Sequence, residues 1–199
     1  MSSLDAETLN FYASEAEAYS GRSRSIQNER LDRFLKALPA GAKILELGCG
    51  GGQDSQVMLA RGFDVTSTDG SPEMAQQAER LLGRPVTVLA FDRLEEDGIY
   101  DGVWANACLL HIPRRELAAV LSRIHRALNI GGVFYASFKA GSAEGRDRFQ
   151  RYYNYPSRDW LTAQYAPLGW TSMEIDENIG GGYDGENTEW LHVTTVRSA

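Results

Sequence analysis

A glycine-rich turn after a short apolar segment is the part of this chain whose residue types and spacing indicate a chemical function most specifically. Residues 44–47 have the pattern of a buried strand, residues 48–52 are rich in glycine, and residues 53–60 have a helical pattern. Asp54 or Ser55 is expected to cap that helix, because a side-chain oxygen can accept a free backbone N–H. A strand, a turn without side chains and a helix N-terminus let a ligand lie against backbone amides. The segment therefore predicts a site for a nucleotide-like ligand.

Acidic residues stand at the ends of the next two predicted strands. Asp69 follows a strand predicted over residues 63–68, and its carboxylate could accept both hydroxyls of a ribose. Phe91 and Asp92 end a strand predicted over residues 85–91, where the ring could stack on adenine and the carboxylate could accept from its amino group. A turn or cap role for Asp69, and an ordinary core ring with a loop acid at 91–92, are the alternatives. Ligands of open α/β sheets bind beyond the carboxyl ends of strands, so these residues are expected to share one site.

The fourth predicted strand covers residues 100–106. The segment from Asn106 to Pro113, which contains His111, is expected to face the reacting group. Because an ordinary histidine pKa lies near neutrality, His111 is the candidate for a general base. A role in shape or hydrogen bonding is the alternative. His125 and His192 lie in a predicted helix and in the last predicted strand, where structural roles are expected.

The elements that must position these residues alternate along the chain. Predicted strands cover residues 44–47, 63–68, 85–91, 100–106 and 133–138. Predicted helices cover residues 53–60, 71–82, a segment with an apolar stripe from Leu117 to Leu128 that is closed by Gly131 and Gly132, and residues 159–166. This alternation implies a mostly parallel sheet with helices on both faces. Two last strands, residues 171–175 and 189–196, are joined without a helix, which favours an antiparallel pair.

The first 38 residues stand outside this alternation. Residues 4–38 are predicted to be helical in two pieces, divided near Ser20 and Gly21. Two interpretations remain for residues 1–38: a helical cap over one sheet edge, and a lid over the ligand. The chain shows no internal repeat and no linker, so residues 1–199 are predicted to be a single domain with an α/β core over residues 39–199.

Composition restricts the classes of partner. The net charge of −7 argues against a nucleic-acid surface, which needs a basic footprint, and favours a small molecule. No stretch approaches the ~20 apolar residues that span a bilayer, and the first residues lack the features of a signal peptide. Cys49 and Cys108 are expected to be buried thiols in a reducing cytoplasm and cannot form a metal cluster by themselves. No metal and no membrane contact are therefore expected, and the location is expected to be cytoplasmic.

The order acid-Leu-Gly-x-Gly-x-Gly at Glu46 to Gly52 resembles motif I of the class I S-adenosylmethionine-dependent methyltransferases. A dinucleotide fingerprint would need glycine where this chain has Gln53. The resemblance implies a Rossmann-like, seven-stranded, mostly parallel sheet with an antiparallel last strand, and S-adenosylmethionine as cofactor. It also implies that Asn106 acts through its backbone. The expected cofactor-binding residues are Glu46, Gly48, Cys49, Gly50, Gly52, Asp69, Gly70, Met74, Phe91, Asp92 and Asn106.

Within that family the chain is similar to small bacterial enzymes that act on metabolites, including tellurite-resistance-type members. The similarity includes an aromatic N-terminal segment, the run from Leu110 to Pro113 and the tyrosines between Gly145 and Tyr155. The expected substrate residues are Tyr12, Tyr19, His111, Tyr153, Tyr155 and Tyr183. Such rings could enclose an amine, a thiol or a flat ring. Arg146, Arg148 and Arg151 could bind an anion, although solvated helix charges are the simpler interpretation.

The sequence therefore predicts an enzyme that transfers a methyl group from S-adenosylmethionine to a small molecule. A sulfonium makes the methyl electrophilic, so a general base is needed only if the nucleophile arrives protonated. A non-catalytic S-adenosylmethionine-binding or sensing domain is one rival. A nicotinamide-dependent oxidoreductase is a second, disfavoured by Gln53 and by the shortness of the chain. A monomer or a weak homodimer is expected.

Overall fold

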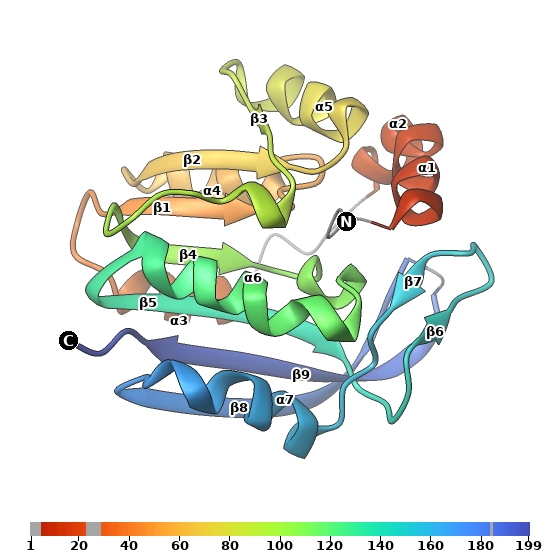
Figure 1. The fold of residues 1–199 in the computed structure, drawn as a ribbon. Coiled ribbons are helices and arrows are strands. Elements are labelled where there is room, and N and C mark those ends of the chain that lie inside the picture. Colours follow the sequence, from red (N-terminus) through yellow and green to blue (C-terminus); the bar gives the residue numbers. More distant parts are fainter. Residues whose placement is uncertain (1–4, 23–28, 184) are drawn as a thin grey trace.

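One seven-stranded sheet lies at the centre of the computed structural model, which describes residues 5–22, 29–183 and 185–199 (Figure 1). Its strands follow the order β3-β2-β1-β4-β5-β9-β8. Their bounds are β1 Lys43–Leu47, β2 Asp64–Asp69, β3 Thr87–Val88, β4 Tyr100–Ala105, β5 Leu128–Lys139, β8 Ser172–Gly181 and β9 Asn187–Val196. The strands β1 to β5 pair in parallel, whereas β9 is antiparallel to both β5 and β8. The predicted α/β fold with an antiparallel last strand is confirmed.

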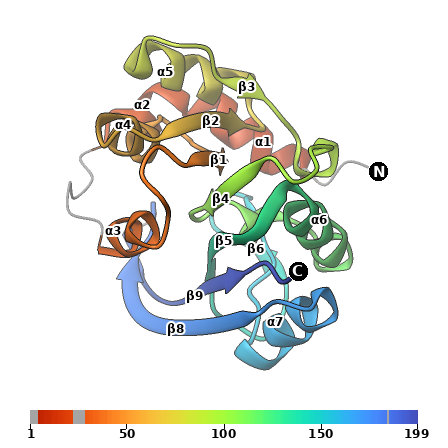
Figure 2. The ribbon, with the colours of Figure 1, turned by 90° about the vertical axis from the view of Figure 1, so that its left-hand side faces the viewer.

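Helices cover both faces of this sheet, as predicted (Figure 2). On one face lie α6 (Arg114–Ala127) and α7 (Arg158–Tyr165), and on the other lie α3 (Glu29–Lys36) and α4 (Gln53–Ala60). The α6 stripe packs Leu117, Leu121 and Ile124 against β4 and β5 in the larger core. On the opposite face, Phe34 of α3 packs on Trp104 of β4, with ring centroids 5.1 Å apart. α6 and α3 thus bury their apolar stripes, the main source of helix stability in proteins.

The N-terminal helices lie in two different places relative to the sheet. α1 (Ala6–Ser14) and α2 (Ala16–Ser20), together called the cap below, lie beyond the carboxyl ends of the strands, beside α5 (Pro72–Leu82) (Figure 1). α3 instead covers a sheet face. The predicted division near Ser20 and Gly21 agrees with the end of α2. Residues 1–4 and 23–28 of the predicted helical region lie outside the described residues.

A small hairpin stands at the same edge of the molecule as the cap. It pairs β6 (Gly145–Arg146) with β7 (Tyr152–Tyr153) in antiparallel register and is called the hairpin below. Figure 1 shows it next to α1 and beyond the end of β5. Two segments far apart in the sequence therefore close over the strand ends together.

The third predicted strand is much shorter than expected. Instead of residues 85–91, β3 has two exposed residues, and Phe91–Arg93 form a 3-10 turn, η1. β3 is an edge strand, and Pro85 before it cannot donate to a ladder. Phe91 nevertheless points inward and is 5% exposed.

Two other boundaries differ from the predictions. α4 begins after Gly52, which has φ of 85° and makes no side-chain cap, so the predicted caps at Asp54 and Ser55 are wrong. Their side chains bind inside the fold instead, as described below. α6 ends at Ala127, and β5 already begins at Leu128, because a register shift near Tyr100 lets the strand pass through Gly131 and Gly132. The last two strands are also longer than predicted and include Gly180 and Gly181.

The described part of the chain has no helix long and apolar enough to cross a membrane. Both cysteines are free and buried, in agreement with the predicted thiols.

Candidate active site

The glycine turn, residues 48–52, connects β1 to α4, and Cys49 supplies its one side chain. Three of its residues have positive φ angles: 63° at Gly48, 59° at Gly50 and 85° at Gly52. Residues with a side chain rarely adopt this region. A Cβ at Gly48 would stand 2.4 Å from Cβ of Cys108, in the segment that follows β4. The close approach of two strand ends therefore requires glycine at this position.

Asp69 ties the glycine turn to the next strand end. Its carboxylate accepts one hydrogen bond from the backbone N of Gly50 and one from the backbone N of Ser71, both at 2.9 Å. Ser71 in turn caps α5, because its hydroxyl accepts from the N of Met74. Burial raises the pKa of Asp69 to about 6, although the backbone amides act in the opposite direction. This carboxylate therefore fixes the backbone of the glycine turn beside the end of β2.

Polar side chains beneath the turn are bound to one another. Glu46 is 3% exposed and accepts a hydrogen bond from the hydroxyl of Ser55. Asn106 donates from Nδ2 to Asp54 at 3.2 Å and accepts from the hydroxyl of Ser137 at 2.9 Å. Both ends of the Asn106 amide are thus held by protein groups. This arrangement explains why Asp54 and Ser55 do not cap α4.

A cavity of about 470 Å³ opens over these strand ends, within the range of ~300–1,000 Å³ for ligand pockets. The predicted site residues that line it are Glu46, Gly48, Cys49, Gly50, Asp69, Gly70, Met74, Phe91, Asn106, Tyr12, Tyr19, His111, Tyr153 and Tyr183. Three others, Gly52, Asp92 and Tyr155, are not among the lining residues. Gly52 caps α4, Asp92 lies in η1, and Tyr155 stacks on Tyr153 with centroids 5.1 Å apart.

His111 is 8% exposed and is held at both ring nitrogens. Nδ1 lies 2.6 Å from the carbonyl oxygen of Tyr152, and Nε2 lies 2.9 Å from the hydroxyl of Tyr12. A carbonyl can only accept, so this network assigns the proton to Nδ1 and makes Nε2 the acceptor of the Tyr12 hydroxyl. Burial lowers the pKa of His111 to about 4, and the nearby positive charges of Arg151 and Lys139 add to this. The expectation of a near-neutral pKa is wrong, and the imidazole is neutral at pH 7.

The cap contributes rings to the cavity. Tyr12 lies edge-on to Tyr19, with centroids 5.2 Å apart, and Tyr19 stacks on Tyr183 at the same distance. The guanidinium carbon of Arg22 lies 3.9 Å from the Tyr19 centroid and 4.7 Å from that of Tyr183. The hydroxyl of Tyr183 donates to Glu15 of the cap at 3.0 Å. The β8–β9 connection and the cap therefore meet through aromatic side chains.

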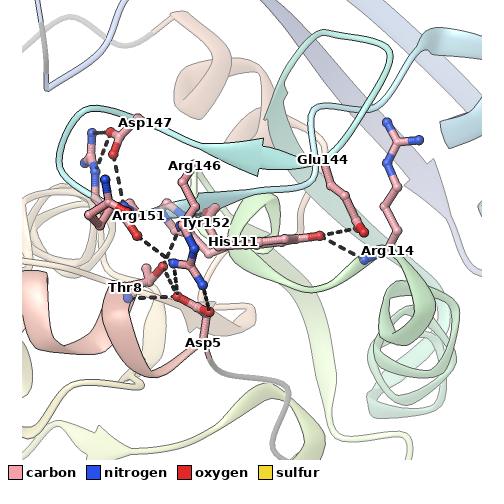
Figure 3. A network of polar contacts seen from close by, with 10 residues as sticks. Asp5, Thr8, His111, Arg114, Glu144, Arg146, Asp147, Arg151 and Tyr152 are labelled. Carbon is pink, nitrogen blue, oxygen red and sulfur yellow. Dashed lines mark hydrogen bonds and ion pairs between the residues drawn. The ribbon is translucent and has the colours of Figure 1, made fainter.

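The hairpin joins the cap through one ion pair and one hydrogen bond from its backbone (Figure 3). Arg146 binds Asp5 through two hydrogen bonds, of 2.9 and 2.7 Å, and the N of Tyr152 donates to the hydroxyl of Thr8 at 2.8 Å. Arg151 is 1% exposed and pairs with Asp147 at 2.6 Å. The interpretation as solvated helix charges is therefore wrong for Arg151, because the segment is a hairpin and this guanidinium is buried.

Several lining residues are not among the site residues expected from the sequence, although Lys139 and Asn178 belong to segments that follow strand ends. Lys139 at the end of β5 pairs in register with Trp190 of β9, which pairs with Asn178 of β8, and all three line the cavity. His192 also lines it, although a structural role was expected. The signal for Lys139 was its place at the end of a predicted parallel strand. Trp190 and His192 reach this edge because β9 is antiparallel and therefore begins where the parallel strands end.

The lining also fits a nucleoside-containing cofactor. A Cβ at Gly50 would stand between Met74 Cε and Tyr19 Cε1, 3.8 Å from each, and would fill part of the cavity. The missing side chain thus leaves space against the backbone. The buried ring of Phe91 supplies an apolar surface, and Asp69 supplies a carboxylate, next to that space.

The strand order, the antiparallel β9 and the glycine turn together define a class I S-adenosylmethionine-dependent methyltransferase fold. The chain belongs to the methyltransferase-domain family, whose model matches residues 19–168. Members of this family use S-adenosylmethionine as the methyl donor.

Relatives agree with this assignment. The chain is 34% identical over 117 residues to a ubiquinone biosynthesis O-methyltransferase of Xanthomonas oryzae, covering 54% of this chain and 48% of that protein. It is 32% identical over 100 residues to an uncharacterized methyltransferase of Synechocystis, covering 49% and 47%. The chain thus spans about half the length of the curated relatives it matches.

Among solved structures, the chain is similar to the 1,6-didemethyltoxoflavin-N1-methyltransferase of Burkholderia thailandensis, which holds 1,6-didemethyltoxoflavin and S-adenosylhomocysteine. The TM-score is 0.77 at 22% identity, covering 98% of this chain and 88% of that one. The phosphoethanolamine N-methyltransferase 2 of Haemonchus contortus, in complex with S-adenosyl-L-methionine, has a TM-score of 0.77 at 17% identity, covering 98% and 61%. At these identities the likeness shows the fold.

Proposed function

We propose that this chain is an S-adenosylmethionine-dependent methyltransferase that acts on a small molecule. The observation that carries the proposal is the opening of the glycine turn, Asp69, Asn106 and His111 into one cavity. When bound, S-adenosylmethionine supplies an electrophilic methyl carbon, and the electron pair of the carbon–sulfur bond stays on sulfur. The protein's remaining task is to hold an acceptor in line and exclude water.

The cofactor-binding role is assigned to the β1–β4 side of the cavity. Asp69 would accept the ribose hydroxyls, and Phe91 with Met74 would pack on the adenine. The glycine turn and the backbone at Asn106 would hold the methionine part. Asp92 and Gly52 support this side from outside the lining, through η1 and the start of α4.

The acceptor-binding role is assigned to the cap, His111 and the tyrosines of the hairpin and the β8–β9 connection. A neutral imidazole with a pKa of about 4 is a weak base at pH 7, so His111 acts here as a positioning residue that fixes Tyr12. Tyr155 supports Tyr153 by stacking. We propose that the cap serves as a lid, because its residues Tyr12 and Tyr19 line the cavity.

Calorimetry with S-adenosylmethionine, S-adenosylhomocysteine and NAD tests the proposal. We expect the two adenosyl compounds to bind and NAD to give no heat of binding. Binding of NAD alone would contradict the proposal and favour an oxidoreductase. A screen of phenols, thiols, amines and metalloid oxyanions, followed by S-adenosylhomocysteine release, then identifies the acceptor. Cofactor binding with no product from any class would favour a sensing domain.

The partner is proposed to be a small molecule rather than a nucleic acid or a membrane, since the net charge is −7. A cytoplasmic location is proposed from the two buried free thiols. A monomer or weak homodimer is proposed, and its sedimentation behaviour would test it.

A further inference from the structure

The acidic residues that line the cavity gather on the cofactor side. Of the acids lining it in the described part of the chain, Glu46 is the last residue but one of β1, Asp69 ends β2, and Asp54 lies in α4 next to Asn106. The remaining one, Asp5, is held in the ion pair with Arg146 at 2.7 Å. This side therefore suits a cofactor that carries positive charge.

Cationic side chains gather on the opposite side. Lys139 is 4% exposed at the end of β5, and its Nζ lies 5.1 Å from the Tyr153 centroid and 6.0 Å from that of Trp190. Arg151, which is paired with Asp147, has its guanidinium carbon 5.4 Å from the Tyr153 centroid. Arg22 lies over the rings of Tyr19 and Tyr183, between the glycine turn and the β8–β9 connection. The rings that could form a cage for an ammonium group already bear cations of the protein. An amine with positive charge would add repulsion in a poorly solvated space.

One wall on this side combines an indole ring with glycine backbone. Lys139, Trp190 and Asn178 occupy one register row across β5, β9 and β8, and the next wall is the backbone of Gly180 to Gly182. A Cβ at Gly180 would come within 3.4 Å of the Trp190 ring, so this backbone lies against the indole. Aromatic rings favour stacked or edge-on contacts with other rings, which selects a planar guest.

We propose that the methyl acceptor is a planar aromatic molecule with a negative charge, and that Lys139 binds this charge. The inference rests on the proposed function and names the substrate class of the same site. The charge lies on the nucleophile itself or on a substituent such as a carboxylate. The aromatic rings alone would also allow a protonated amine as acceptor, and this proposal excludes it.

Calorimetry with three phenols of similar shape tests the proposal: 4-hydroxybenzoate, 4-hydroxybenzamide and 4-hydroxybenzylamine are anionic, neutral and cationic, respectively. Each is titrated into the full chain with and without saturating S-adenosylhomocysteine. We expect the anion to bind about tenfold more tightly than the neutral amide, and the amine to bind most weakly. Added salt should reduce the difference. An equal or reversed order in the wild-type chain, or no binding of the anion, would overturn the proposal without recourse to any variant.

A lysine variant then locates the charge. Lys139→Met should lower the affinity for 4-hydroxybenzoate about tenfold, to that of the amide, and leave the amide unchanged. Lys36→Met removes an exposed lysine of α3, outside the cavity lining, and should retain the full preference. An anion preference that survives Lys139→Met would overturn the assignment to Lys139. Failure of S-adenosylhomocysteine to bind would instead contradict the proposed function, because the phenol titrations without it measure the charge preference separately.

Discussion

The two sides of the cavity are built in different ways. On the cofactor side, Asp69 accepts hydrogen bonds from the backbone N of Gly50 in the glycine turn, 19 positions away, and from that of Ser71, 2 positions away. On the acceptor side, Tyr12 contacts His111 across 99 positions, and Thr8 contacts Tyr152 across 144. The first side depends on backbone geometry that few residues can adopt, whereas the second depends on side chains of separate segments. We therefore expect substitutions to be least tolerated at the turn, and the cap to respond independently of it.

The largest effect is expected at Gly48. Gly48→Ala adds a Cβ 2.4 Å from that of Cys108 at φ of 63°, so backbone strain and overlap act together. We expect a loss of about 3 kcal/mol in the free energy of unfolding, measured by urea denaturation. Gly62→Ala is the matched control, because its φ is 84° and no atom lies within 4 Å of the added Cβ. That variant should lose about 1 kcal/mol through backbone strain alone. Equal losses would mean that the contact with Cys108 does not constrain the turn.

The second effect concerns cofactor affinity at Asp69. Asp69→Asn replaces one of the two acceptor oxygens by an NH2 donor, which then faces the backbone N–H of either Gly50 or Ser71. We expect S-adenosylmethionine to bind about a hundredfold more weakly by calorimetry, since hydrogen bonds to charged groups contribute ~1.5–3 kcal/mol. Asp64→Asn is the control, because Asp64 is an exposed acid at the opposite end of the same strand. Unchanged affinity in Asp69→Asn would refute the ribose assignment.

The pH dependence of the same residue gives an independent check. With a pKa of about 6, Asp69 is ionised at neutral pH and protonated in mild acid. Cofactor affinity should therefore fall as the pH decreases through about 6, and Asp69→Asn should remove this dependence. The sign for stability is the opposite. Because the pKa is raised above the ordinary value of 3.8, the contribution of Asp69 to the stability of the free protein is full below that value and is lost as the pH rises through about 6. Urea denaturation of the wild-type chain and of Asp69→Asn over this pH range measures the contribution of Asp69 to the free energy of unfolding.

The cofactor side could be predicted from the sequence because its signals are local. Glu46, the turn glycines and Asp69 stand at the ends of consecutive strands, and the rule for parallel sheets brings such ends together. Errors arose where tertiary contacts outweigh local preference. Ser55 is a good capping residue, yet its hydroxyl donates to the buried Glu46. Pairing of Leu128 with Tyr100 begins β5 where the apolar spacing alone continues a helix.

The acceptor side was only partly predictable, because it depends on contacts that no local pattern encodes. The tyrosines were found by residue type, but the burial of Arg151 follows from its pairing with Asp147 and from rings of the cap. Lys139 and Trp190 come together only through the antiparallel placement of β9. Even the pKa of His111 is set by the surrounding burial rather than by the residue itself.

The smallest effect is expected where the cap joins the hairpin. Arg146→Gln breaks the two hydrogen bonds to Asp5, the residue that also caps α1 by accepting from the N of Thr8 (Figure 3). A partly exposed pair of this kind contributes at most about 1 kcal/mol, so the chain should remain folded. Hydrogen exchange of the α1 amides should become severalfold faster, because the cap loses one of its anchors to the core. The affinity for S-adenosylmethionine should not change.

Arg158→Gln is the matched control for this variant. It breaks an exposed pair with Glu177 of the same length, 2.7 Å, between α7 and β8 and away from the cap. Exchange in α1 should then stay at the wild-type rate. If Arg146→Gln instead weakened cofactor binding as strongly as it loosened α1, the two sides of the cavity would be coupled. The cap would then be part of the cofactor site, because its contact between Ser20 and Gln53 would transmit the change to the glycine turn.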